Sequence, residues 1–344
     1  MGTSTAWHLR RLGLDDVVVV ERETLASGST GKAAGGIRTQ FADELNIRIA
    51  LRSIAEFEHM EEIEWRRNGY LFLLDDEDDL HAFRQALALQ QSLGVPSIEL
   101  SVDDVIAKVP QVATEGLVGA TFCPLDGHAT PEAVVHWYAR EVQVLQGCEV
   151  TGIDVVRGRI RAVETSRGRI ETTIVVCCAG VWSPEIGAMV GIDLPVRGEK
   201  RWIWFSPRDG GLPDSLPLTI DFSTGFYVHR EGPGVAFGGR ENDLELIEPH
   251  VTRRLPILTE LPVQSAWWGW YEQSPDQNAI VGETEEVSRF LYATGFSGHG
   301  FQQAPAIGEH IAQLVTGQIP SLDLSAFSQQ RFTTGEARPE RFVV

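Results

Sequence analysis

The sequence predicts an α/β fold in which a Rossmann-like nucleotide-binding domain is interrupted by an inserted antiparallel β-sheet domain of the α+β type. Three observations support this prediction. The chain begins with a helix pattern that runs into a valine strand. Strand and helix patterns then alternate, and β-rich segments precede a return to strand and helix. At roughly 150 residues a domain, 344 residues are enough for two domains.

The first unit combines a helix, a strand and an acidic residue. Residues 2–13 have the pattern of a short helix, and the apolar run 17–20 is typical of a buried parallel strand. Glu21 follows, and an acidic residue about 20 residues after a helix-opening glycine binds a ribose hydroxyl in Rossmann units. We expect Gly2 to be the third glycine of a G-x-G-x-x-G motif whose first strand and first two glycines are absent from the sequence.

Composition argues against several kinds of partner. The net charge is −19 without a basic cluster, which disfavours nucleic acid and an anionic membrane surface as partners. No apolar run is long enough to predict a membrane span, and the start lacks the pattern of a secretory signal. The four cysteines have no C-x-x-C spacing. We therefore expect a cytoplasmic protein with buried free thiols and no metal site.

The following segments alternate between helix and strand patterns. The expected elements are a helix at 41–64, a strand at 69–74, a helix at 80–93, a strand at 116–123, a helix from Pro131 to about Arg140 and a strand at 142–150. The connection after Arg140 is unusually tight and has no glycine turn.

The second half of the chain is richer in strands. The segments 150–155, 159–165 and 171–178 predict a three-stranded meander. Four more strands, expected in a separate antiparallel sheet, lie at 201–205, 226–229, 234–239 and 266–271. A short core strand at 290–294 runs into a glycine turn, and a helix is expected from Pro305 to Val315.

Three glycine-rich loops are the candidates for ligand binding. The first, residues 28–38, offers small residues that let backbone N–H groups approach a phosphate or a flat ring. The second, at 179–182, follows a strand, and the third, at 295–300, precedes the last long helix and favours an electron-rich ligand atom. Each loop alone could be a plain turn, whereas the order of all three is more specific.

With these motifs the chain resembles the FAD-dependent oxidoreductases of the D-amino-acid oxidase type. It is most similar to sarcosine oxidase β subunits, dimethylglycine dehydrogenases and archaeal proline dehydrogenase β subunits. The resemblance covers nearly the whole chain and is carried by residues 20–22 with 28–30, by 33–41, by YEQSPD at 271–276 and, most specifically, by ATGFSGHGFQQAPAIG at 293–308.

The resemblance implies a two-domain flavoenzyme with FAD buried at the domain junction. Residues 1–68, 126–195 and 286–344 would form a discontinuous FAD-binding domain, and residues 69–125 and 196–285 the substrate domain. Implied for the nucleotide are Gly2, Glu21, Arg22, Ser29, Thr30, Val150, Gly180 and Trp182; implied for the isoalloxazine ring are Ala34, Gly35, Gly36, Gly298, His299, Gly300, Phe301 and Gln302.

Five residues are candidates for catalysis. Arg38 falls where relatives place an arginine that grips the substrate carboxylate with its planar fork, and a surface ion pair is the alternative. Tyr227 and Tyr271 fall on strands that roof the substrate in the family, and ordinary core packing is the alternative for both. Arg240 is a second carboxylate candidate, and His299 lies inside the expected flavin loop.

The chain departs from the monomeric sarcosine oxidases at three places. Gly269 stands where those enzymes have the cysteine that attaches flavin, so non-covalent FAD is expected. Gln302 replaces a lysine, and the lysine that promotes reaction with oxygen is not evident near residues 235–239. These departures favour a dehydrogenase, or an oxidase of another substrate.

The expected function is oxidation of the C–N bond of a small secondary amine or amino acid, of the sarcosine, dimethylglycine or proline type, by hydride transfer to flavin N5. A D-amino-acid or glycine oxidase is the alternative, and a non-catalytic flavin-binding assembly subunit is an alternative of another class. Oxygen or an electron carrier would be the acceptor. Because some relatives work inside larger complexes, a hetero-oligomer with other oxidoreductase subunits is a further expectation.

Overall fold

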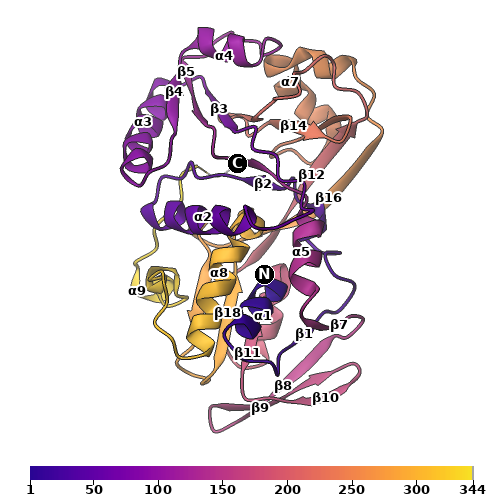
Figure 1. Cartoon of the computed structure of the whole chain (residues 1–344), viewed down its shortest axis with the longest axis vertical. Coiled ribbons are helices and arrows are strands. Elements are labelled where there is room, and N and C mark those ends of the chain that lie inside the picture. The colour runs from indigo at the N-terminus through magenta and orange to yellow at the C-terminus, as the bar shows by residue number, and fades with distance from the viewer. Residues whose placement is uncertain (343–344) are drawn as a thin grey trace.

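The computed structural model describes residues 1–342, which form two lobes (Figure 1). One lobe contains short parallel strands with helices α1 (Gly2–Arg11) and α8 (Gly300–Val315) packed together. The other lobe is built on an eight-stranded sheet, and α2 (Glu44–Phe57) lies between the two. The mixed α/β class predicted from the sequence is therefore confirmed.

The parallel strands occur in two separate sets. Strand β1 (Val18–Val20) pairs with β7 (Gln143–Leu145), and β11 (Val175–Cys177) pairs with β18 (Phe290–Thr294). Strand β17 (Ile280–Glu283) adds to β18 in the antiparallel direction. Within residues 1–342 no strand pairing joins the two sets, and the valines of β1 are only half-buried.

The eight-stranded sheet combines two distant parts of the sequence. Its strands, in spatial order, are β16 (Ser265–Gln273), β12 (Arg197–Ser206), β15 (Gly234–Gly238), β14 (Tyr227–Glu231), β13 (Leu218–Asp221), β3 (Tyr70–Leu74), β5 (Gly119–Cys123) and β4 (Ile98–Leu100). The four strands predicted between residues 201 and 271 are confirmed. The sheet is not wholly antiparallel, however, because β13 and β3 meet in parallel where the two parts of the sequence join.

The predicted meander is wrong in its third strand. The antiparallel meander consists of β8 (Val150–Val156), β9 (Arg159–Thr165) and β10 (Gly168–Glu171). The chain then turns at Thr172, whose hydroxyl accepts a hydrogen bond from the N–H of Ile174 at 3.2 Å. This turn directs β11 into the parallel pairing with β18 instead.

Two predicted helices have different limits in the structure. The helix expected at 41–64 is α2, which begins after Asp43, because this side chain accepts from the N–H groups of Leu45 and Asn46. The helix expected from Pro305 starts earlier, at Gly300. Pro305 lies inside α8, where its missing N–H removes one hydrogen bond without ending the helix.

The remaining elements complete the two lobes. They are the helices α3 (Glu77–Ser92), α4 (Val102–Lys108), α5 (Pro131–Ala139), α6 (Ser183–Ala188), α7 (Leu244–Arg254) and α9 (Arg331–Thr334), the short 3-10 turns η1 (Thr30–Lys32), η2 (Gly180–Trp182), η3 (Pro256–Glu260) and η4 (Ser325–Phe327), and the paired strands β2 (Gly36–Ile37) and β6 (Gly127–His128). All four cysteines are free thiols, as predicted, and three of them are buried, whereas Cys178 is half-buried. Among the described residues no helix is both long and apolar enough to cross a membrane.

Candidate active site

The three glycine-rich loops, at residues 28–38, 179–182 and 295–300, come together in the fold. The backbone N–H of Arg38 in the first loop donates to Oε1 of Gln302, which follows the third loop in the first turn of α8, at 2.7 Å. The first loop also rests on strand β16, where the indole N–H of Trp267 donates to the carbonyl of Lys32 at 3.2 Å. Residues that are far apart in the sequence therefore line one region.

The second loop connects the other two. The guanidinium carbon of Arg22 lies 4.5 Å from the centre of the Trp182 ring, and Gly28 of the first loop faces the same ring. On the other side, the hydroxyl of Thr294 donates to the carbonyl of Gly180 at 3.1 Å. The predicted nucleotide residues Arg22, Gly180 and Trp182 are thus brought together.

The remaining nucleotide candidates lie near the carboxyl end of β1. Glu21 is half-buried, and its Oε1 accepts from the N–H of Glu23 at 2.8 Å. The N–H of Cys148 donates to the Glu21 carbonyl at 2.9 Å, so the start of β8 at Val150 lies close to Glu21. Gly2 lies between β1 and the end of β11 and opens α1, which has no side-chain cap, so its first N–H groups remain available to an anion.

Ser29 and Thr30 are half-buried and form the start of the turn η1. Further along the first loop, Gly35 adopts a positive φ of 73°, and a β-carbon there would lie 2.1 Å from the Ala129 carbonyl oxygen. Only glycine fits that position. The small residues of this loop therefore permit a close approach of its backbone to neighbouring groups.

Arg38 is the central polar residue of the buried end of the site. It is 2% exposed, so the alternative of a surface ion pair is wrong. Its guanidinium carbon lies 4.1 Å from the centre of the Phe41 ring, and it donates to the carbonyls of Gln40 and Phe342 and to Nε2 of His299. Within residues 1–342 no carboxylate reaches ion-pair distance of this guanidinium, and burial lowers the pKa of Arg38.

His299 is held as a neutral imidazole. Burial, followed by the nearby Arg38 charge, lowers the pKa of His299 well below its ordinary value. Because the guanidinium donates to Nε2 at 3.0 Å, this nitrogen carries the lone pair, which leaves the proton on Nδ1. His299 therefore orients Arg38 without adding a second charge.

A buried carboxyl group fixes the segment that follows Arg38. Asp126 accepts from the N–H and the hydroxyl of Thr39 at 2.8 and 2.6 Å, and from the Gln40 amide at 3.2 Å. Burial raises the pKa of Asp126 to about 6, against the opposing effect of these hydrogen bonds. The sequence analysis did not identify this anchor.

Three tyrosines surround the loops. The Tyr271 ring lies against Gly298, where a β-carbon would approach it to 2.6 Å, and Gly298 adopts a positive φ of 91°. Tyr227 directs its hydroxyl towards Gly238, and burial raises the pKa of both Tyr227 and Tyr271. Both candidate tyrosines are therefore neutral phenols; Tyr271 contacts the third loop, whereas Tyr227 faces Gly238 on the neighbouring strand.

A third tyrosine at the site was not predicted from the sequence. Tyr70, on β3, is buried, and its hydroxyl lies 1.9 Å from where a β-carbon of Gly36 would be, so it touches the expected ring-binding loop. The only indication in the sequence is that a tyrosine opens β3, YLFLL, whose other residues are leucine and phenylalanine. A lone hydroxyl at the end of an apolar strand indicates a binding site only weakly.

Two arginines on the sheet have different positions. Arg201, another residue that the sequence analysis missed, lies on β12 with its guanidinium 5.3 Å from the centre of the Tyr271 ring. It pairs with Glu199, and its buried Nε has no hydrogen-bond partner among the described residues. The predicted Arg240 is instead exposed at the end of β15, where it packs against Gly225.

A cavity of about 160 Å³ borders the first loop at residues 31–34. Its walls include His128 and His229, whose ring centres are 4.9 Å apart, and neither the second nor the third loop contributes to it. Burial is the main cause that lowers the pKa of His128 to about 3 and that of His229 to about 4, so both are neutral at neutral pH.

The arrangement suits an elongated ligand that has an anionic end and a flat polar ring. Uncapped helix N–H groups, a carboxylate at a strand end and an indole ring lie at one end. Glycine backbone, neutral tyrosines and a buried arginine lie at the other, where they can hold a small acid against the ring. These groups fit a dinucleotide with a redox-active ring.

Comparison with known proteins gives a consistent result. Residues 1–314 match the family described as FAD dependent oxidoreductase (DAO). FAD-dependent oxidoreductase domain-containing protein 1 of Bos taurus is 31% identical, over 100% of this chain and 85% of that protein. Sarcosine dehydrogenase, mitochondrial, of Mus musculus is 27% identical over 96% of this chain, and the chain spans 40% of its length.

The fold is also similar to a solved structure. L-proline dehydrogenase from P. horikoshii superimposes with a TM-score of 0.91 at 30% identity, over 98% of this chain and 96% of that chain.

Proposed function

This chain belongs to the DAO family of FAD-dependent oxidoreductases, and its relatives include sarcosine dehydrogenase and L-proline dehydrogenase. We propose that it oxidises the C–N bond of a small secondary amine or amino acid that carries a carboxylate. Sarcosine, dimethylglycine and proline are the substrates to test. FAD, when bound, supplies the acceptor for the hydride that leaves the carbon next to the nitrogen.

The buried charge of Arg38 carries this proposal. Arg38 is 2% exposed, and within residues 1–342 the carboxylates of Glu340 and Asp126 act on its guanidinium electrostatically without coming to ion-pair distance. A buried cation is stabilised by an anion that forms charge-assisted hydrogen bonds with it. A substrate carboxylate supplies this anion and fixes the amine next to the loops of Gly36 and Gly298.

The neighbouring side chains set the protonation state of the substrate. His299 and the tyrosines are neutral, since burial keeps the imidazole unprotonated and the phenols protonated. A poorly hydrated site disfavours an ammonium ion, so the substrate would react as a neutral amine. Tyr70 and Tyr271 exclude water and offer hydroxyl donors around it.

The other predicted residues would hold the cofactor without a covalent bond. Glu21 would accept from the adenosine ribose, and the N-terminus of α1 with Ser29 and Thr30 would hold the pyrophosphate. We propose the two domains with the sequence limits stated above, except that β17 is counted with the FAD-binding domain because it pairs with β18.

Anaerobic reduction of the FAD-loaded protein tests the proposal. Sarcosine, dimethylglycine, proline, glycine and D-alanine are mixed with it, and absorbance at about 450 nm, a usual flavin band, is followed. Bleaching by sarcosine, dimethylglycine or proline is expected. Bleaching by glycine or D-alanine alone would favour the oxidase alternative. A yellow protein that no amine bleaches would favour the assembly subunit, and a protein that takes up no FAD would contradict every reading.

Three further proposals concern the setting of this reaction. The missing lysines favour an electron carrier over oxygen as the acceptor. Oxygen-uptake and dye-reduction assays compare the rates with the two kinds of acceptor directly. Copurification from the native source tests a hetero-oligomer with other oxidoreductase subunits. Cell fractionation tests the cytoplasmic location, since the similar sarcosine dehydrogenases are named as mitochondrial proteins.

A further inference from the structure

The segment of residues 335–342, which we call the strap, runs from the end of α9 to Arg38. At its far end, the carbonyl of Phe342 accepts a hydrogen bond from Nη2 of Arg38. The Phe342 side chain is 2% exposed and stacks on Phe83, with ring centres 3.9 Å apart and an interplanar angle of 13°. The strap therefore ends inside the substrate region.

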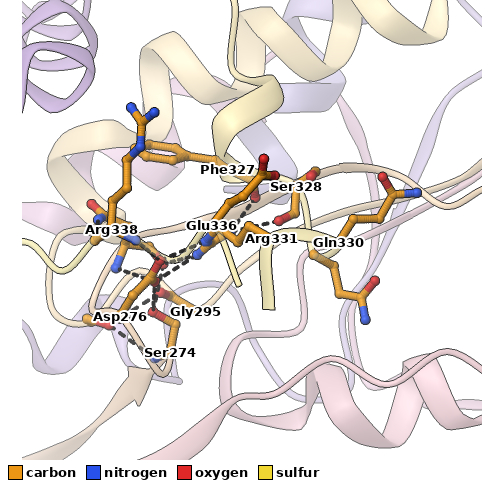
Figure 2. A network of polar contacts seen from close by, with 12 residues as sticks. Ser274, Asp276, Gly295, Phe327, Ser328, Gln330, Arg331, Glu336 and Arg338 are labelled. Carbon is orange, nitrogen blue, oxygen red and sulfur yellow. Dashed lines mark hydrogen bonds and ion pairs between the residues drawn. The ribbon is translucent and has the colours of Figure 1, made fainter. Parts of the chain in front are cut away.

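A buried ion pair anchors the beginning of the strap (Figure 2). Arg331 donates from Nε and Nη2 to the two carboxylate oxygens of Asp276 at 2.8 and 2.9 Å, and both side chains are almost fully buried. Nη1 of Arg331 also donates to the carbonyls of Phe327 and Ser328 at 2.6 and 3.0 Å. This bidentate geometry fixes α9 to the YEQSPD motif that carries Tyr271.

Asp276 also holds the backbone of the strap. Its carboxylate accepts from the N–H of Arg338 at 3.3 Å, and its carbonyl accepts from the N–H of Glu340 at 3.1 Å. Figure 2 shows that the guanidinium of Arg338 itself turns away from this carboxylate, and the residue is exposed. Only the backbone of Arg338 takes part in the anchor.

Glu340 ties the strap to the segment that contains Arg38. It is 2% exposed, and its Oε1 accepts from the N–H groups of Ala42 and Phe342 at 3.3 and 3.0 Å. Its Oε2 accepts from the amide of Asn46 at 3.3 Å. Exchange of the Ala42 amide hydrogen is therefore a direct measure of whether the strap is seated.

The strap occupies a nitrogen that a substrate carboxylate needs. Both N–H groups of Nη2 of Arg38 are engaged, one by Phe342 and one by His299. A guanidinium can bind a carboxylate with two parallel bonds either through Nη1 and Nη2 or through Nε and Nη2. Each of these pairs includes Nη2, so a bidentate carboxylate has to replace one of the two existing partners.

We propose that the strap is an intramolecular competitor of the substrate carboxylate, and that Arg331 is a positioning residue that sets substrate affinity through Phe342 and Arg38. This inference rests on the proposed function. Because binding is weakened by the fraction of protein in which the strap is seated, loosening the strap tightens the binding of a carboxylate. Damage to the fold alone would weaken it.

The test compares Arg331→Gln with Arg338→Gln, which removes the same charge from an exposed residue of the strap beyond the end of α9. For the FAD-loaded protein, the proline concentration that gives half-maximal anaerobic flavin reduction should fall about tenfold in R331Q, since one hydrogen bond to a charged group is at stake. The limiting reduction rate and the value for prolinamide, which lacks the carboxylate, should not change. R338Q should match the wild type.

Two additional measurements keep the inference testable. Phe342→Ala removes the stacking on Phe83 while Asp276–Arg331 stays intact, so it should reproduce the effect of R331Q even if R331Q folds poorly. Hydrogen exchange at residues 38–42 should be faster in both variants and unchanged in R338Q, without any substrate. If no amine reduces the flavin of the wild-type protein, the proposed function fails. Hydrogen exchange alone then decides whether Arg331 and Phe342 keep the strap seated. Weaker proline binding or unchanged exchange in both variants overturns the inference.

Discussion

The two ends of the candidate site are built in opposite ways. At the nucleotide end, Glu21 and Trp182 are half-buried, lie on loops or strand ends, and make few polar contacts. At the ring end, Arg38 and His299 are buried, and Arg38 is held by three hydrogen bonds, one of them to His299. We propose that the open end admits the cofactor and that the desolvated end, where electrostatic interactions are strongest, selects the substrate.

The largest effect is expected at Arg38. Arg38→Lys keeps the charge but loses the fork, so two charge-assisted hydrogen bonds to the substrate carboxylate are lost, and the half-saturating proline concentration should rise about 100-fold. Anaerobic stopped-flow reduction measures this. The matched change at the open end, Arg22→Lys, should leave it within about twofold. Equal effects of the two substitutions would remove the contrast between the ends.

The next effect is expected at Gly298. Gly298→Ala places a methyl group 2.6 Å from the Tyr271 ring and forces a non-glycine residue to a φ of 91°. We expect a loss of roughly 1–3 kcal/mol of stability from the backbone alone, with weaker FAD binding in addition. Gly317→Ala, with a φ of 71° and no atom within 4 Å, is the control for backbone strain alone. Thermal unfolding with and without FAD separates the two contributions.

Acid pH should lower the stability of the fold through His128 and His229, the two buried histidines beside the first loop. Their folded pKa values, about 3 and about 4, lie below the ordinary value of 6.5. The unfolded chain therefore binds more protons, and stability that is complete above pH 6.5 is lost as the pH falls towards 4. His229→Gln should reduce this loss by about 1–2 kcal/mol at pH 5. His81→Gln, on exposed α3, should not, as denaturant unfolding at pH 5 and 7 will show.

The smallest effect is expected at Glu21. Glu21→Gln should weaken FAD about tenfold, because one charge-assisted hydrogen bond to the ribose becomes neutral. The reduction rate at saturating FAD should stay the same, since Glu21 lies at the open end. Titration of the apoprotein with FAD measures the affinity. A change in substrate affinity would contradict the division between the two ends.

The sequence predicted what depends on neighbouring residues. The order of the acidic strand end and the three loops can be read along the chain, so Glu21 was expected at a ribose from the sequence itself, whereas the roles of Arg38 and His299 were expected from the family resemblance. Tyr70 and Arg201 were not predicted, because the order of strands in the sheet places them at the site. Tyr70 lies on β3, which joins the second half of the sheet through its parallel pairing with β13. Nothing local connects Phe342 to Arg38, since 304 residues separate them.

The errors have the same origin. The third meander strand was misplaced because an apolar run does not reveal which sheet it joins, and a hydroxyl turn at Thr172 decided it. Arg240 follows two glycines and looked suited to a close approach; these glycines are buried, whereas Arg240 itself, just beyond β15, is exposed. Both residues are arginines, so sheet topology, rather than residue type, decides that Arg201 lies beside Tyr271 and that Arg240 is exposed.

The buried guanidinium has a practical consequence at the bench. Small organic anions such as acetate or formate carry the same head group as an amino acid and are drawn to the same positive potential. Kinetic measurements in carboxylate buffers would then report competition by the buffer, whereas zwitterionic buffers of bulky sulfonates would not. Substrate screens should therefore begin in buffers free of small acids.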